Sequence, residues 1–407
     1  MSRVKFMNSL FFLRLFFLFL SFIFCLTLTV WSSSPVLRVK ILGEKKSISV
    51  GATGPYQIES EKGKRQFYLS SASLRKIEAT SSGMKVDNII WGNKVWIKPQ
   101  KNSSLALIII KGDKRRYRGD LIIKEEEGFL KVINQLPLEE YLYGVIKWEL
   151  SPDWPLATLC AQTIAARTYA LKNMESSLSQ GQLYHLSATV DDQVYGGVES
   201  EDSRVQKVVD LTQGKVITYQ GELINAFYHN CCGGYTTSSK DAWGGKDFPY
   251  LRVGPDKFCQ GSPHYHWKWE IKRSELEKIL LKEMLPVGRI DRIQVLSRAQ
   301  NLSFEEGGRV TKLCLEHYGD RSYCLTGTEF RKLIDKWIGR GKLKSTLFDK
   351  VRLRVKGGIS YFVFQGRGSG HGVGMCQWGA KEMAEQGYSF EEILQFYYPG
   401  TKIEKRY

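Results

Sequence analysis

Short β-type segments follow one another from Val36 to about Val132. Each contains β-branched or aromatic residues, and clusters of Gly, Asn, Ser and Lys separate them. The segments read VLRVKIL, SISV, YQI, QFYL, KVWIKP, LALIII and GDLIIK. Runs of this kind bounded by turn-forming residues are typical of β-strands. We therefore predict a small β-rich N-terminal region over residues 35–127.

The spacing of apolar residues becomes helical after Pro137. A helix ending near Glu149 is predicted, and its core-facing residues are Tyr141, Leu142, Val145 and Ile146. The turn SPDWP, residues 151–155, leads into a second helix, PLATLCAQTIAARTYALKNM, because Pro suits the first helical position. This second helix is nearly apolar all round, so we expect it to be buried.

Helical and strand patterns are mixed in the rest of the chain. KVITYQGELINAFYHN indicates a hairpin with a turn near Gly221. Around residues 268–364, helices are predicted at SELEKILLKEML and GTEFRKLIDKWIG, with strands beside them. Near the C-terminus a glycine-rich loop precedes a helix closed by Gly387 and a helix that begins with a capping box, Ser389-x-x-Glu392. These patterns together predict an α+β fold.

One charged side chain lies within the apolar stripe of the second helix. At 100° per residue, Arg167 shares that stripe with Leu156, Cys160, Ile164, Leu171 and Met174. A guanidinium keeps its charge, so a buried one needs an acid or several carbonyl groups. We favour a structural ion pair over contact with a ligand, and Glu149 is one candidate partner.

The N-terminus has the composition of an export segment. Arg3 and Lys5 precede a long apolar stretch, and residues 15–31 carry no charge. A positive segment before an apolar run is typical of export signals. Because no A-x-A cleavage site follows, residues 1–34 are interpreted either as a signal peptide or as a membrane anchor. We expect an exported protein, in the periplasm or on the outer face of the cytoplasmic membrane, and attached to that membrane if the segment is uncleaved.

The chain is strongly basic, with a net charge of +17 and a pI near 9.4. Nucleic acid is the usual partner of such a chain, but export argues against it. Polyanions outside the cytoplasm are phospholipid headgroups, acidic wall polymers and glycans with carboxylates. Solubility alone is the other explanation of the charge.

The chain has eight cysteines, and in an oxidising compartment Cys314 and Cys324 are one candidate disulfide. By ligand type, a zinc site would fit the set His229, Cys231, Cys232, Cys259, His264 and His266. Their spacing is not a standard one, and a disulfide from Cys231 or Cys232 to Cys259 explains the cysteines at least as well. We therefore expect no metal and no cofactor.

A glycine-rich loop near the C-terminus surrounds one side chain, His371. Glycines occupy every second position from 366 to 374, a spacing that fits neither a Walker motif nor a dinucleotide fingerprint. The loop is interpreted either as a crowded backbone crossing or as a floor of N–H groups with an imidazole facing a polar substrate. We favour the second interpretation.

Three acids are candidates for chemistry. Glu149 lies between Trp148 and Leu150 before a Pro-rich turn, and an apolar pocket would raise its pKa and keep a proton available near neutral pH. A structural pair with Arg167 is the alternative. Asp191 and Asp192 could supply a second carboxylate for glycoside hydrolysis, although adjacent acids more commonly close turns.

The most specific pattern is a set of four segments between about residues 128 and 405. They read LPLEEYLYGVIKWELSPDWPLATLCAQTIAARTYAL, DDQVYGG, INAFYHNCCGGYT and GSGHGVGMCQWGAKEMAEQGYSFEEILQFYYPGT. In this order they resemble the SpoIID/LytB family. The resemblance implies a catalytic domain of helices packed on a β-sheet over residues 128–407, with a mixed α/β insertion around 268–364. It does not extend to residues 36–127.

The resemblance also implies an activity. The sporulation branch of the family consists of lytic transglycosylases that cut peptidoglycan glycan strands. The catalytic acid of that branch precedes a WP turn and matches Glu149, although Leu150-Ser151-Pro152 replaces a shorter Met-Pro form. The amidase-modifying branch lacks this acid, so the presence of Glu149 favours an enzyme.

A zinc site of some family members is expected to be absent. Those members hold zinc with His and Cys residues in the segment that reads HLSATVDDQ here. His185 remains, but Thr189, Asp191 and Asp192 stand where the other ligands are expected.

Together these observations predict cleavage of glycan strands with Glu149 as the general acid/base, which leaves 1,6-anhydro-muramic ends. The candidate substrate-binding residues are Arg167, Gln162, Tyr195, His229, His371 and Gln377. The expected partners are glycan strands, with or without stem peptides, and an amidase that acts upstream. Two alternatives stay open: a non-catalytic peptidoglycan-binding activator of a cell-wall amidase, and a two-carboxylate glycoside hydrolase.

Overall fold

The computed structural model describes most of the chain after residue 33. The described residues are 34–61, 66–69, 73–100, 105–110, 113–286, 288–317 and 321–407. The expected export segment therefore lies outside the described residues, apart from Ser34. None of the helices within these ranges is long and apolar enough to cross a membrane.

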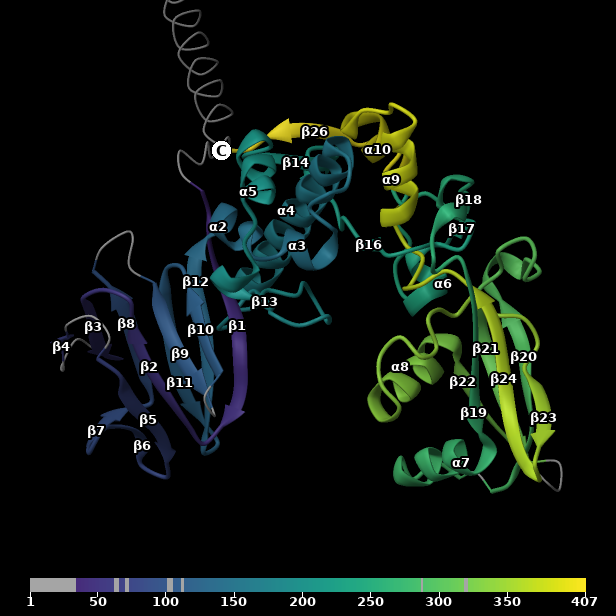
Figure 1. The fold of residues 1–407 in the computed structure, drawn as a ribbon, viewed down its shortest axis with the longest axis horizontal. Helices are drawn as coiled ribbons and strands as arrows, with labels where there is room; N and C mark the ends of the chain where they lie inside the picture. Colours follow the sequence, from purple (N-terminus) through teal and green to yellow (C-terminus); the bar gives the residue numbers. More distant parts are fainter. Residues whose placement is uncertain are drawn as a thin grey trace, which may run out of the picture.

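Two sheets form the N-terminal region (Figure 1). One has seven strands in the order β13-β1-β12-β11-β8-β3-β4, and the other has six in the order β10-β9-β2-β5-β6-β7. Their strands are β1 (Val36–Lys45), β2 (Ser47–Ala52), β3 (Tyr56–Ser60), β4 (Gln66–Leu69), β5 (Arg75–Thr80), β6 (Gly83–Val86), β7 (Ile89–Gly92), β8 (Lys94–Pro99), β9 (Ala106–Ile110), β10 (Asp113–Tyr117), β11 (Asp120–Glu126), β12 (Phe129–Pro137) and β13 (Leu186–Ser187). All of the predicted segments are strands, and side chains from both sheets share one core.

The structure adds strands that the pattern did not predict, and β10 shows why. Its sequence is DKRRY, and it forms an edge of the six-stranded sheet. Charged residues are common on edge strands because they discourage pairing with other chains. A strand of this composition lacks the apolar run on which the prediction relied.

The seven-stranded sheet joins the N-terminal region to the rest of the protein. β1 pairs antiparallel with β12, with Val36 opposite Pro137, and it pairs in parallel with β13. Strands from both sides of the expected boundary at residues 127 and 128 thus belong to one sheet. Backbone hydrogen bonds therefore hold the two regions together.

The helix predicted to end at Glu149 is two helices, α2 (Leu138–Tyr143) and α3 (Ile146–Glu149). The predicted core residues are all buried. The break falls at Gly144, where a Cβ atom would lie 2.7 Å from the ring of Tyr195. Only glycine fits this close approach, and it also lowers helix stability. The second predicted helix is α4 (Leu156–Ser179), and it is buried along most of its length.

Arg167 of α4 is fully buried and forms an ion pair, as predicted, but with Glu139 of α2. Its Nε and Nη2 atoms donate to the two carboxylate oxygens at 2.9 and 2.7 Å. The guanidinium also donates to the carbonyl oxygens of Lys215 and Val209, both at 3.2 Å. Glu149 is therefore not the partner of Arg167.

The rest of the central part surrounds α4. Its remaining elements are η2 (Gly197–Ser200), α5 (Ser203–Leu211), β14 (Lys215–Tyr219), β15 (Glu222–Leu223), β16 (Tyr228–His229), β17 (Tyr235–Thr236), α6 (Ser239–Trp243), β18 (Gly254–Pro255), η3 (Phe258–Gly261), β25 (Met375–Cys376), α9 (Gln377–Glu385), α10 (Phe390–Tyr397) and β26 (Lys402–Lys405). The predicted hairpin is β14–β15, and the predicted capping box of Ser389 and Glu392 begins α10. The α+β fold class is thus confirmed.

The segment between η3 and β25 forms the mixed α/β insertion (Figure 1). Its elements are β19 (His266–Lys272), α7 (Arg273–Lys282), β20 (Ile290–Arg298), η4 (Ala299–Asn301), β21 (Val310–His317), β22 (Arg321–Thr326), α8 (Gly327–Trp337), β23 (Arg352–Lys356) and β24 (Ile359–Arg367). They form two three-stranded sheets, β20-β21-β22 and β19-β24-β23. The helix α7 packs on the second sheet, and α8 packs on the first.

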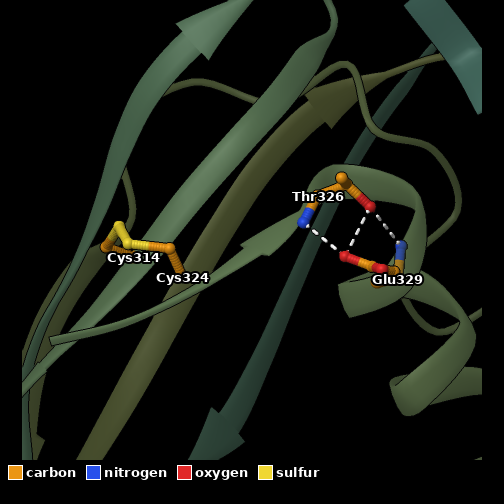
Figure 2. Close-up of a disulfide and its surroundings, with 4 residues drawn as sticks. All are labelled: Cys314, Cys324, Thr326 and Glu329. Atoms are coloured by element: carbon orange, nitrogen blue, oxygen red, sulfur yellow. Dashed lines mark hydrogen bonds between the residues drawn. A yellow bond between two sulfur atoms is a disulfide. The ribbon is translucent and has the colours of Figure 1, made fainter. Parts of the chain in front are cut away.

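Figure 2 shows the disulfide between Cys314 and Cys324, which joins neighbouring strands β21 and β22 of the insertion. The sequence predicted this pair. The same figure shows a second capping box, in which Thr326 and Glu329 begin α8. The disulfide thus crosslinks β21 and β22, and the capping box fixes the start of α8 directly after β22.

We expect the double substitution Cys314→Ser and Cys324→Ser to destabilise the insertion by about 2–3 kcal/mol, because the bond closes a loop of about ten residues in the unfolded chain. Urea unfolding under non-reducing conditions measures this difference. An unchanged unfolding midpoint would show that the bond adds nothing to stability.

Candidate functional site

A cavity of about 800 Å³ lies between the central part and the insertion. The α4 and α9 helices, the β16 strand and the Gly-rich loop contribute side chains to its wall, and α8 of the insertion contributes Lys332. The aromatic lining residues are Trp148, Tyr169, Phe227, Tyr228 and Trp243. Its polar lining residues include Glu149, Asp191, Asp192, His229, His371 and Gln377. Rings beside hydrogen-bonding groups suit a ligand that has both apolar faces and hydroxyl groups.

Glu149 ends α3, and its carboxylate lines this cavity. Gln377 Nε2 donates to its Oε2 at 3.3 Å, and the hydroxyl of Tyr228 is a second hydrogen-bond partner. Burial raises the pKa of Glu149 to about 7. The hydrogen bonds to Gln377 and Tyr228 favour the ionised form and offset only part of that rise. Near neutral pH the carboxyl group is therefore divided between its protonated and ionised forms.

The apolar neighbours of Glu149 in the sequence are not what buries it. Trp148 is 60% exposed, and Leu150 packs into a separate cluster with Leu159 and Cys160. Consecutive helical residues point to different faces, so flanking residues say little about a side chain's surroundings. The prediction of a shielded acid was correct, but the residues on which it was based, Trp148 and Leu150, are not the ones that shield it.

A chain of hydrogen bonds fixes the groups around Glu149. Tyr141 donates to Gln193 Oε1 at 3.2 Å, and Gln193 Nε2 donates to the Tyr228 hydroxyl at 2.9 Å. On the other side, Gln377 Nε2 also lies 3.4 Å from Gln162 Oε1. Because Tyr141, Gln193 and Gln162 are buried, these contacts hold Tyr228 and Gln377 in place.

The backbone of a single residue, Val373, holds both His229 and His371. The carbonyl oxygen of Val373 accepts from His229 Nδ1 at 3.1 Å, and its N–H donates to His371 Nδ1 at 3.1 Å. Burial lowers the pKa of both rings, to about 3 for His371, so both are neutral at pH 7. A neutral ring carries one proton, so Nε2 is an acceptor in His229 and a donor in His371.

The Gly-rich loop has the crowded backbone of the first predicted interpretation. A Cβ atom at Gly372 would lie 2.3 Å from the Arg309 guanidinium, and one at Gly374 would lie 2.0 Å from the carbonyl oxygen of Phe227. Both glycines also have positive φ angles. The loop is therefore a crowded crossing, and the same crossing brings His371 to the cavity.

Asp191 and Asp192 line the cavity but are also parts of a turn. The Asp192 N–H donates to Thr189 O at 3.1 Å, as the turn interpretation predicted. The Asp192 carboxylate accepts from Tyr169 and from the Ser187 N–H. Asp191 is largely exposed and pairs with Arg340 of the insertion at 3.1 Å.

The structure brings together only some of the candidate substrate-binding residues. His229, His371 and Gln377 line the cavity with Glu149, and Gln162 lies behind Gln377. Two candidates do not line it. Arg167 is paired with Glu139 in the core, and the hydroxyl of buried Tyr195 donates to Asn134 at 3.0 Å.

Sequence reasoning missed several cavity residues: Tyr228, Phe227, Trp243 and Lys332. Phe227 and Tyr228 stand in the segment INAFYHNCCGGYT beside His229, so proximity to a candidate was an available signal. No local pattern marks Trp243 or Lys332, because other parts of the fold bring them to the cavity.

The candidate zinc set of His and Cys residues is not assembled as a whole. His229 faces the cavity, His264 lies beside Lys344, and His266 is exposed. Cys231, Cys232 and Cys259 do lie together, next to Cys376. His185, the residue retained from the other family zinc segment, lies with both ring nitrogens near Arg38 donors.

Glu149→Gln should change how stability depends on pH. A carboxyl with a raised folded-state pKa is stabilising when protonated, and that contribution is lost as pH rises from about 4.5 to 7. A shift of this size corresponds to up to about 3 kcal/mol at about pH 8. The uncharged glutamine avoids this loss, so the variant should be the more stable protein there and close to wild type near pH 4. Urea unfolding at both pH values tests this, and equal free energies of unfolding at pH 8 would contradict it.

The two parts of the protein that meet at the cavity match two different domain families. The stage II sporulation protein family, SpoIID, matches residues 126–219, which hold Glu149. A domain family of unknown function, DUF8618, matches residues 258–374, which include the insertion.

Three similar proteins match longer stretches. An uncharacterized protein of Brachyspira hyodysenteriae is 27% identical over 92% of this chain and 94% of its own length. The amidase enhancer of Bacillus subtilis is 29% identical over 87% of this chain, which spans 53% of that protein, about half its length. Stage II sporulation protein D of the same organism is 27% identical over 67% of this chain and 76% of its own length. The chain thus carries a SpoIID domain around Glu149, and over longer stretches it is similar to an amidase enhancer and to a stage II sporulation protein D.

Proposed function

We propose that this protein is a lytic transglycosylase that cleaves the glycan strands of peptidoglycan. The SpoIID domain and similarity to an amidase enhancer support a role in the cell wall. The observation that supports the transglycosylase mechanism is Glu149, a carboxyl with a pKa of about 7 in a cavity lined by aromatic and hydrogen-bonding side chains.

Protonated Glu149 would act first as a general acid. It donates its proton to the glycosidic oxygen, the bond from that oxygen to the anomeric carbon breaks, and an oxocarbenium-like centre develops on the sugar. A carboxyl with a pKa near the working pH is suited to this step, because a large fraction is protonated and the proton is still readily given up.

Ionised Glu149 would then act as the base. It removes the proton from the 6-hydroxyl of the same sugar, and that oxygen bonds to the anomeric carbon. The product carries a 1,6-anhydro end, the proton returns to Glu149, and no water is consumed. One carboxyl group thus serves both steps, and a second carboxylate is not required.

The other cavity residues suit a glycan ligand. Tyr169, Phe227 and Trp243 offer ring faces, and His371 offers a donor for a sugar hydroxyl. The basic chain, with a net charge of +17, is complementary to the lactyl carboxylates of strands that an amidase has freed of peptides.

Two other functions make different demands on the same cavity. An activator of a cell-wall amidase, to which the similarity with the amidase enhancer lends weight, would not need Glu149. A two-carboxylate hydrolase would use Asp191 or Asp192, which line the same cavity, and would produce reducing ends.

Mass spectrometry of glycan incubated with the purified protein separates these functions. We expect 1,6-anhydro ends, and substrates with and without stem peptides define the preferred form. Reducing ends would favour the hydrolase. Intact glycan, together with faster cleavage by an added amidase, would favour the activator.

A further inference from the structure

A second group of chemically reactive side chains lies outside the cavity. Cys232, Asp256, Cys259 and Cys376 come from three segments of the chain, since Asp256 and Cys259 are neighbours, and all four are buried. Their ligand atoms, three sulfurs and one carboxylate oxygen, lie within 4.8 Å of one another. We propose that these four residues bind a zinc ion. This departs from the expectation, based on sequence spacing, that no metal is bound.

The distances suit a metal better than a disulfide. Ligands at about 2.3 Å from a tetrahedral zinc lie about 3.8 Å apart. The Cys232 sulfur is 3.2 Å from that of Cys259 and 3.3 Å from Asp256 Oδ2. A disulfide between Cys232 and Cys259 would account for two of the four groups and would leave Cys376 and Asp256 buried beside it without a role.

The groups around the cluster orient its ligands. The N–H groups of Cys232 and Gly379 donate to the Cys376 sulfur at 3.2 and 3.4 Å. Asp256 accepts from the Tyr397 hydroxyl and from the Phe258 N–H, both at 2.9 Å. Hydrogen bonds from surrounding groups to the ligating side chains are typical of metal sites, because they fix the orientation of the ligands.

A metal–thiolate group would also explain the buried positive charge of Arg309 next to the cluster. Arg309 is buried, and its guanidinium donates to the carbonyl oxygens of Cys232 at 2.8 Å and Gly370 at 3.2 Å. Within the described part of the chain Arg309 forms no ion pair with a carboxylate, and its bond to the Cys232 carbonyl places its charge beside the proposed ligands. Three thiolates and a carboxylate around a divalent ion leave an excess of about two negative charges, and a buried guanidinium offsets part of it.

The position of the site indicates a structural role. Cys376 immediately precedes Gln377, and the pairing of β16 with β25 places Tyr228 beside Met375 and His229 beside Cys376. Gln377 and Tyr228 are the two hydrogen-bond partners of Glu149. A zinc ion here would tie β16, β25 and η3 together and hold both partners in place, without itself reaching the cavity.

Elemental analysis of the purified full-length protein tests the site. We expect about one zinc per chain, as in structural sites with four protein ligands. Zinc should fall to background in Cys232→Ser, Cys259→Ser and Cys376→Ser. Cys231→Ser is the matched control, since this neighbouring buried cysteine is outside the ligand set, and it should keep its zinc.

A second measurement covers variants that fail to fold. Cobalt(II) added to metal-free wild-type protein should give the absorption bands of tetrahedral thiolate ligation. A Cys232–Cys259 disulfide in protein isolated without reductant, or cobalt without thiolate bands, would overturn the site, and loss of zinc from Cys231→Ser would overturn the ligand set. These readouts do not depend on glycan cleavage, so they stand apart from the proposed activity.

Discussion

Glu149→Gln should lower the rate of glycan cleavage by at least about 10²–10⁴-fold, the contribution of general acid–base catalysis. Glutamine keeps the shape of the side chain and can still bond to Gln377 or Tyr228, but it cannot donate a proton to the glycosidic oxygen. Removing the charge should also favour folding at neutral and alkaline pH, and urea unfolding of the variant checks that it remains folded under the assay conditions. The release of anhydro-ended fragments, followed by mass spectrometry, measures the rate.

Asp191→Asn and Asp192→Asn are the matched controls, because both acids line the same cavity. They should cost much less, since the sugar supplies its own nucleophile. If Asp192→Asn abolishes cleavage and the wild-type products have reducing ends, the hydrolase mechanism replaces the one proposed. If Glu149→Gln releases anhydro ends at the wild-type rate, Glu149 is not the acid.

The pH dependence follows from the same group. The first step needs protonated Glu149, and its pKa is about 7. The rate of that step should therefore fall as pH rises above about 7, whereas an unshifted glutamate would be mostly ionised already near pH 5.

Arg167→Met should destabilise the protein by about 3–5 kcal/mol, because it leaves a buried carboxylate without its partner. Among the described residues, the Glu139 carboxylate would keep the Tyr407 hydroxyl, at 2.6 Å, and the Gly214 N–H, at 3.3 Å. Since methionine fills much of the space of the arginine stem, the loss would report on the charge rather than on a cavity. Urea unfolding measures it.

Two further variants separate the charge from other effects. Glu139→Leu combined with Arg167→Met should recover much of the stability, because both charges are removed. Arg116→Met breaks the Arg116–Glu199 pair, whose side chains are 44% and 39% exposed, and should cost no more than about 1 kcal/mol. An unfolding curve of Arg167→Met that matches wild type would show that the buried pair is unimportant.

The sequence by itself determined the local structure wherever short-range patterns carry it. The predicted strands of the N-terminal region, α4 and the capping box of α10 depend on residues a few positions apart, and each was predicted. Cys314 and Cys324 are ten residues apart and lie on neighbouring strands, so their spacing in the sequence was enough to suggest the disulfide. The apolar stripe of α4 was enough to require an acid for Arg167, because a buried guanidinium cannot lose its charge.

Only the tertiary structure decided which groups meet. Gln377 is 228 residues from Glu149, and Cys376 is 144 residues from Cys232, so no spacing in the sequence relates them. Glu149 was one candidate partner of Arg167 from the sequence, and the packing of α2 against α4 places Glu139 there instead. The pKa of Glu149 likewise depends on burial produced by segments far apart in the chain. Hydrophobic periodicity is a local property, whereas desolvation and ligand geometry arise only when distant segments pack together.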